Sequence, residues 1–175
     1  NLAEVSIFDK SNANTKNHLS PYTLREYAEI RETLDILVED IDPSEPDIDK
    51  FAVIYDRLAS KIVYDTPATM SPNFDGAMYH AKKINTARNL LGGLEEEKCV
   101  CAGFADILRN ALLLVGIDSR YNLGFCKHKN DRRRNSGHAW NQVLLDDGTG
   151  TKKWYYTDLT WDAGRDTYDW TLLGD

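Results

Sequence analysis

Apolar residues recur every three to four positions in two stretches near the start of the chain, and this period predicts two amphipathic helices. The first helix spans residues 20–41, with Ser20 as a candidate N-cap. Segment 42–47 contains two prolines and interrupts the pattern, and the second helix begins at Asp47 or Asp49. The apolar faces are Leu24, Tyr27, Ile30, Leu34, Leu37 and Ile41 in the first helix, and Phe51, Ile54, Tyr55, Leu58 and Ile62 in the second. The pair predicts a helical hairpin.

The helical period is lost after this hairpin. Residues 64–84 hold two prolines and a glycine, which predicts a long irregular connection that contains one short helix. Residues 85–93 then predict a short helix that starts near Thr86 and stops at Gly92 and Gly93.

A third long helix is predicted for residues 100–115, with Gly116 as its C-terminal stop. Its apolar positions are Val100, Phe104, Ile107, Leu108, Ala111, Leu112 and Val115. Segments rich in alternating, β-branched or aromatic residues follow at 120–125, 138–145 and 152–161, and the turn sequence at 146–150 separates the last two. The order of helices followed by antiparallel strands predicts an α+β fold.

Length and composition fit one domain. The chain has 175 residues, of which 42% are hydrophobic, and we expect a polar arm at 1–19 followed by a domain at 20–175. The first residue is Asn rather than Met and the last residues are WTLLGD, so we expect a part of a longer protein. No apolar run is long enough to predict a membrane span, and we expect a secreted or cell-envelope location in preference to the cytoplasm. The sequence predicts no oligomeric state.

The net charge of the chain bears on which classes of partner it could bind. A formal charge of −7 argues against general nucleic-acid binding, which requires a basic surface. Basic residues do gather at 127–134, where we expect a solvated loop; a docking patch for an acidic partner is the alternative.

Cys101 falls in the first turn of the predicted central helix. The unpaired N–H groups and the positive dipole end of a helix favour a thiolate there, and a thiolate is the reactive form of cysteine. Gly103 would let a substrate backbone approach the sulfur. A buried, inert cysteine is the alternative interpretation.

His138 opens one predicted strand, and Asp158 lies near the end of the next. The two residues stand ten positions before and ten positions after Gly148, so a turn centred on that glycine would bring their side chains within reach. A carboxylate in that position could hold the imidazole tautomer and stabilise the imidazolium of a thiolate–imidazolium pair.

Three sequence blocks carry a family resemblance: CAGFADIL, GHAWNQV and YYTDLTWD. They resemble the C-x-G-[YF]-A, H-x-W and D-x-T-W blocks of the transglutaminase-like superfamily, and the chain is similar to its bacterial-type members. The resemblance implies a papain-like core in which the Cys-bearing helix packs against an antiparallel sheet. It also implies acyl transfer at amide bonds of a protein or peptide substrate, with no cofactor, through Cys101, His138 and Asp158. Cys101 rather than Cys99 fits the spacing of the first block.

Further site residues are candidates on this reading. The backbone N–H of Cys101 is the natural first oxyanion donor, and Tyr64 is a candidate second donor, with packing as its alternative role. Trp140, like Trp154 and Trp161, is expected to build the core and the walls of the cleft.

Several alternatives stay open at this point. Cys99, Cys101, Cys126 and His128 form C-x-C and C-x-H pairs that could gather around zinc, although we favour no metal. The domain could instead be a non-catalytic binding module. Within the enzyme interpretation, a cysteine peptidase or amide hydrolase is favoured over a protein-glutamine transglutaminase, because the sequence contains neither the additional domains nor an evident calcium loop of animal transglutaminases.

Overall fold

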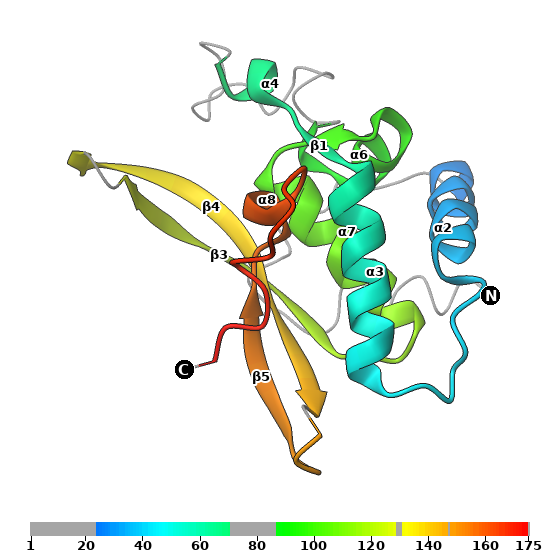
Figure 1. Ribbon diagram of the computed structural model, residues 1–175. Coiled ribbons are helices and arrows are strands. Elements are labelled where there is room, and N and C mark those ends of the chain that lie inside the picture. The colour runs from blue at the N-terminus through cyan, green and yellow to red at the C-terminus, as the bar shows by residue number, and fades with distance from the viewer. Residues whose placement is uncertain (1–23, 71–86, 129–130, 147, 175) are drawn as a thin grey trace.

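The computed structural model describes residues 24–70, 87–128, 131–146 and 148–174 of the chain (Figure 1). Its helices are α2 (Leu24–Val38), α3 (Asp47–Lys61), α4 (Thr66–Met70), α6 (Leu90–Glu96), α7 (Cys101–Leu114) and α8 (Leu159–Asp162). Its strands are β1 (Val63–Tyr64), β2 (Lys98–Cys99), β3 (Ser119–His128), β4 (Asp131–Asp146) and β5 (Lys152–Thr157). This mixture of helices and an antiparallel sheet confirms the predicted α+β class.

The two predicted N-terminal helices are present as α2 and α3. Helix α3 begins at Asp47, as predicted, and its predicted apolar positions are all buried. Among the side chains of α2 that the structure describes, Ile30 and Leu34 are the buried ones. The predicted start of the first helix and the arm at 1–19 lie outside the described residues, as do residues 71–84 of the predicted connection. Within the rest of that connection, α4 is the one short helix described.

Helix α7 is the centre of the core. Phe104, Ile107, Leu108, Ala111 and Leu112 have no exposed surface, which confirms the predicted apolar face. They pack with α3 residues such as Ile54 and Leu58 and with β4 residues Val143 and Leu145 in one hydrophobic cluster. In Figure 1 the longer helices lie together on one side of the sheet, and the β3–β4 hairpin extends beyond them. The core thus fixes α7 against β4.

Strand β4 lies between β3 and β5, and both pairings are antiparallel. The β4–β5 pairing runs from Asp146↔Lys152 to Asn141↔Thr157 and ends there. The β3–β4 pairing continues further, through Gly124↔His138 to His128↔Asp131. His138 therefore lies where the described sheet has narrowed to two strands.

The expectation of a solvated loop at 127–134 is wrong. Strand β3 runs to His128 and β4 begins at Asp131, and the backbones of Lys127 and Asn135 are paired. Backbone pairing is indifferent to side-chain charge, and charged residues are common on exposed strands because they discourage edge-to-edge association. The described parts of the basic run, residues 127–128 and 131–134, thus lie on the two strands of a hairpin.

The predicted end of the short helix at its glycines is also wrong. Helix α6 continues through Gly92 and Gly93 to Glu96, and Glu97 ends it in a left-handed conformation with φ 49°. Asn89 caps the start of the helix, since its side chain accepts a hydrogen bond of 2.8 Å from the backbone N–H of Gly92. A β-carbon on Gly93 would lie 2.7 Å from Cδ1 of Ile107. That glycine permits close packing against α7 and does not terminate the helix.

A third difference concerns the block around Asp158. The sequence pattern predicts a strand over 152–161, but β5 ends at Thr157 and Asp158 is the N-cap of α8. The Asp158 side chain makes no cap hydrogen bond to the helix, and its carboxylate contacts His138 instead.

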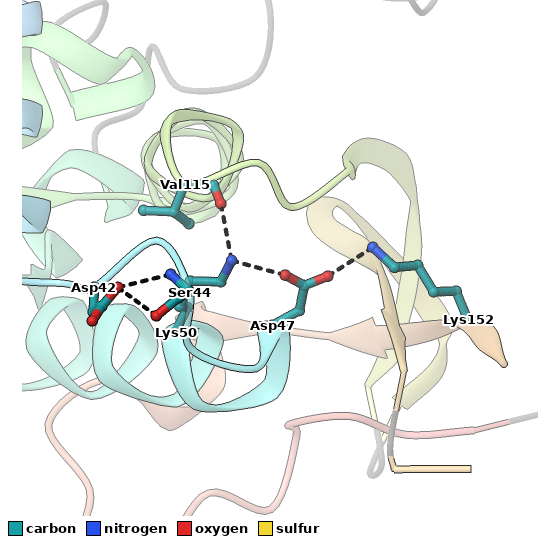
Figure 2. A network of polar contacts seen from close by, with 6 residues as sticks. All are labelled: Asp42, Ser44, Asp47, Lys50, Val115 and Lys152. Carbon is teal, nitrogen blue, oxygen red and sulfur yellow. Dashed lines mark hydrogen bonds and ion pairs between the residues drawn. The ribbon is translucent and has the colours of Figure 1, made fainter. Parts of the chain in front are cut away.

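A polar network joins the far end of α7 to α3 and β5 (Figure 2). The buried Lys50 forms a 2.9 Å ion pair with Asp47 and lies 3.4 Å from the backbone oxygen of Val115. Asp47 is also paired with Lys152 at 2.7 Å, and these two lysines hold the pKa of its carboxyl below the usual range. Buried lysines are rare unless they are paired, and this pairing links three elements at one end of the core.

Within the described residues, no helix combines the length and the apolar character that crossing a membrane would require.

Candidate functional site

Cys101 is the first residue of α7, and the strand β2 leads directly into it. Val100, the N-cap, has extended backbone; its N–H donates to the backbone oxygen of Ala87 at 2.8 Å, and its own oxygen accepts from Gly103 at 2.9 Å. The backbone on both sides of Cys101 is therefore fixed. The Cys101 side chain is partly exposed, and the first N–H groups of a helix have no partner within the helix. A thiolate or an oxyanion could be stabilised at such a helix end.

His138 and Asp158 form a short contact at the open end of the sheet. Nε2 of His138 lies 2.5 Å from Oδ2 of Asp158, and the two side chains are 9% and 13% exposed. Because a carboxylate only accepts hydrogen bonds, Nε2 carries the proton of this bond and Nδ1 is left to face another group.

Cys101 is the second partner of the imidazole. Burial works to lower the pKa of His138, but hydrogen bonds with Asp158 and Cys101 outweigh burial, and the pKa rises to about 9. The imidazole is therefore charged at neutral pH and lies between a carboxylate and a sulfur. This is the arrangement of an imidazolium that can pair with a thiolate and later supply a proton.

The backbone of Asp158 is held from two directions. Its N–H donates to the oxygen of Trp170 at 2.9 Å, and its own oxygen accepts from the N–H of Trp161 at 3.1 Å. The segment that contains Trp170 is itself fixed, because Leu173 forms a two-bond bridge with Tyr156 on β5. Asp158 is thus held in position by main-chain bonds as well as by its helix.

Two tryptophan rings flank the imidazole. The ring centre of Trp140 lies 6.0 Å from that of His138 at an interplanar angle of 20°, and the ring centre of Trp161 lies 5.6 Å away. Nε1 of Trp161 is 3.1 Å from Nε2 of His138, on the nitrogen that also faces Asp158. Both rings therefore lie against the imidazole of the His138–Asp158 pair.

Tyr64 lies on β1, next to the strand that leads into Cys101. It is paired with Cys99 through strands β1 and β2, and its ring stacks on that of Phe104 at 6.4 Å. Burial raises the pKa of Tyr64 to about 12, and the charges of Cys101 and Cys99 add to this. The phenol is therefore protonated at neutral pH and can donate a hydrogen bond.

Gly103 does not have the role that the sequence suggested. A β-carbon at this position would lie 2.6 Å from Cβ of Cys99 and 3.0 Å from the backbone oxygen of Ala87. The space left by the missing side chain is filled by β2 and the segment before α6, and the residue is buried. The glycine is required for packing and not for the approach of a substrate.

The other two cysteines differ from Cys101. Cys99 has no exposed surface, and burial raises the pKa of its thiol well above the usual range. Cys126 is half-buried; burial raises the pKa of its thiol, and the charges of Asp158 and Cys101 contribute. The zinc alternative finds no support in the described side chains, among which no group of three or more His, Cys, Asp or Glu could hold a metal ion. The side chain of His128 is not among them.

Sequence reasoning missed two contributors to the site. Trp161 was expected only to build the core and the cleft walls, yet it contacts His138. Asp158 and Trp161 are three positions apart at the start of α8 and so lie on one face, which places both next to the imidazole. Gly124 was not considered; it is paired with His138, and the ring of Trp140 lies over it. A helix start predicted at Asp158 would have placed Trp161 near His138. Nothing in the local sequence indicates the role of Gly124.

Comparison with known proteins identifies the family. The sequence profile of the transglutaminase-like superfamily matches residues 36–159, which include Cys101, His138 and Asp158. The chain belongs to the transglutaminase-like superfamily. No curated protein matches its sequence significantly.

A solved structure shares the fold. A TGase structure aligns with 95% of this chain at a TM-score of 0.60 and 20% sequence identity. A candidate cysteine protease from Cytophaga hutchinsonii aligns with 86% of the chain at a TM-score of 0.48 and 16% identity. This alignment covers 43% of the protease. This chain spans 38% of the length of the TGase.

Proposed function

We propose that this chain is a thiol-dependent acyl-transfer enzyme that acts on amide bonds, with Cys101 as nucleophile, His138 as general base and acid, and Asp158 as the group that orients the histidine. We further propose that water is the usual acceptor, which makes it a cysteine peptidase or amide hydrolase. The observation that carries the proposal is the position of His138 between the Asp158 carboxylate, 2.5 Å away, and the Cys101 sulfur.

The reaction would proceed in two halves. The Cys101 thiolate attacks the amide carbonyl carbon and forms a C–S bond, and the C–N bond breaks as the imidazolium of His138 gives its proton to the leaving amine. The neutral imidazole then takes a proton from water, whose oxygen attacks the thioester. The acid product leaves, and sulfur and imidazole return to the charged pair.

Two neighbouring groups support this scheme. The developing oxyanion would be stabilised by N–H groups at the start of α7 and by the protonated phenol of Tyr64.

A labelling experiment tests the nucleophile. Iodoacetamide is added at neutral pH and the alkylation of Cys99, Cys101 and Cys126 is followed by mass spectrometry. We expect Cys101 to react at least tenfold faster than Cys126, because a thiolate paired with an imidazolium is the reactive species. Equal rates, together with no turnover of any amide, would favour the non-catalytic binding module.

A substrate screen tests the reaction. Peptide, glutamine and glycopeptide amides are incubated with the wild type, with Cys101→Ala and with the matched control Cys126→Ala. We expect turnover by the wild type and the control and none by Cys101→Ala. Release of product acid without amine incorporation supports hydrolysis, whereas release of ammonia with incorporation of an added primary amine would identify a transglutaminase. Unchanged activity of Cys101→Ala would refute the mechanism.

A further inference from the structure

Asn141 is a buried amide at the junction of α7, β3 and β4. The residue is 1% exposed. Its Nδ2 donates to the backbone oxygen of Ala105 at 2.9 Å and to the backbone oxygen of Arg120 at 3.3 Å. One side chain thus connects the helix that begins at Cys101 with the edge strand of the sheet.

The position of Asn141 relates it to all three residues of the candidate site. It lies three positions after His138 on β4, and its partner on β5 is Thr157, the residue before Asp158. Ala105 lies four positions after Cys101 on α7. Helix α7 and strand β4 are joined by the bond between Asn141 and Ala105, and Cys101 at the start of the same helix forms a hydrogen bond with His138, whose side chain leaves the opposite face of β4 from that of Asn141.

We propose that Asn141 is a positioning residue that sets the separation and angle between α7 and β4, and so aligns Cys101 with His138. This inference rests on the proposed function.

Packing alone does not explain an amide at this position. Its neighbours on the same face of β4, Ala139, Val143 and Leu145, are all buried and apolar. Burying an amide among them costs free energy unless hydrogen bonds compensate. The oxygen of Ala105 does not need this bond either, because a carbonyl inside a helix already accepts from the N–H four residues later. The bond instead fixes the position of β4 along the axis of α7.

The distance between the Ala105–Asn141 contact and the Cys101–His138 contact explains why the position of β4 along α7 affects the candidate site. Four residues advance a helix by about 6 Å, and three residues advance a strand by about 10 Å. Two contacts so separated define the angle between the elements, whereas apolar contacts permit sliding. Loss of the Ala105 contact would let the helix shift, and displacement of a reacting group by about 1 Å can cost roughly 100-fold in rate.

Replacement of Asn141 by Leu separates positioning from stability. Leucine has a similar size and suits the apolar face, but it donates no hydrogen bond, so we expect Asn141→Leu to fold with a melting temperature near that of the wild type. On the best amide substrate of the wild type, we expect kcat to fall at least tenfold while KM changes less than threefold. The control is Ser119→Ala, which removes a buried hydroxyl on β3 that has no hydrogen bond within the described residues.

Alkylation of Cys101 by iodoacetamide between pH 4 and 9 supplies the second measurement. A misaligned imidazolium stabilises the thiolate less, so the acid limb of the rate profile should move upward by about one pH unit in Asn141→Leu. A purely structural role would leave this limb in place in folded protein. If the leucine variant does not fold, Asn141→Ala, which leaves more space, takes its place.

The outcomes are distinguishable. An active wild type and an Asn141→Leu variant with unchanged kcat and acid limb would overturn the inference and leave the proposed function intact. A wild type without selective alkylation of Cys101 and without turnover would overturn the proposed function, and the inference with it.

Discussion

The ring of Trp140 lies across Gly124 so closely that a β-carbon on the glycine would be 2.6 Å from Cη2 of the ring. Gly124 is paired with His138 across the strands, and the same tryptophan ring stacks on the imidazole. The missing side chain of Gly124 therefore makes room for a wall of the candidate site.

Gly124→Ala tests this relationship. The tryptophan must move, so we expect a loss of about 1–3 kcal/mol in the free energy of unfolding, together with a changed KM for amide substrates. Urea unfolding and steady-state kinetics measure the two effects. The matched control is Gly137→Ala on β4, where an added β-carbon meets nothing within 4 Å. Equal stability of both variants would contradict the account.

The raised pKa of His138 predicts how stability depends on pH. Because the pKa in the folded state, about 9, exceeds the ordinary value of 6.5, the charged imidazole stabilises the fold fully below pH 6.5 and loses this effect as pH rises through 9. Wild type should exceed His138→Gln in stability at pH 6 and lose up to about 3 kcal/mol of that advantage by pH 10, at about 1.4 kcal/mol per pH unit. Urea unfolding of both proteins across this range measures it. If the stability difference between wild type and His138→Gln instead increased with pH, the pKa of His138 would be lowered in the folded state and not raised.

Asp158→Ala should weaken the reaction without always abolishing it. Burial of His138 and its hydrogen bond with Cys101 remain, whereas the hydrogen bond with Asp158 is removed, so the pKa of His138 should fall and less imidazolium should be present near neutral pH. We expect a decrease in kcat of about 100-fold, as for loss of general acid–base assistance, with a larger decrease at pH 8 than at pH 6. The exposed Asp166→Ala in the same C-terminal segment is the control. A uniform decrease at all pH values would argue against an electrostatic role.

The contact between His138 and Asp158 was predictable in part. The turn at 146–150 and the antiparallel strands follow from local sequence, and they bring the two segments together. Yet the observed register pairs Asn141 with Thr157, so Asp158 would not stand opposite His138 if β5 continued. The contact forms because the chain leaves the sheet at Asp158, and a count along the sequence does not contain that turn.

The roles of glycines could be predicted from the local sequence in some positions and not in others. Gly116 ends α7 with φ 81°, and the sequence predicted that stop. Gly93 and Gly103 looked like a stop and an opening for substrate, but both are fixed by close packing against residues of other elements. The neighbours that decide such positions come from elsewhere in the chain, and only the tertiary structure supplies them.

The C-terminal segment presents the last test, because a buried carboxylate ties it to the site. Asp162 has no exposed surface and accepts from the hydroxyl of Tyr55 at 2.8 Å, from the N–H of Trp170 at 3.1 Å and from the hydroxyl of Thr171 at 3.2 Å. The oxygen of the same Trp170 accepts from the N–H of Asp158. Asp162 therefore supports the backbone of Asp158 through one residue, Trp170.

Two substitutions separate the parts of this support. Tyr55→Phe removes the hydrogen bonds of the Tyr55 hydroxyl, among them the bond to Asp162, and should cost about 1.5–3 kcal/mol, with activity largely kept, because Trp170 remains bonded. Asp162→Ala leaves several buried donors without an acceptor; it should cost more than Tyr55→Phe and should also lower kcat, because Trp170 and then Asp158 lose their fixed positions. Urea unfolding and kcat on folded protein measure both effects, and the exposed Thr167→Val is the control. If Tyr55→Phe lowered kcat as much as Asp162→Ala, the bond to Trp170 would not be what holds Asp158 in place.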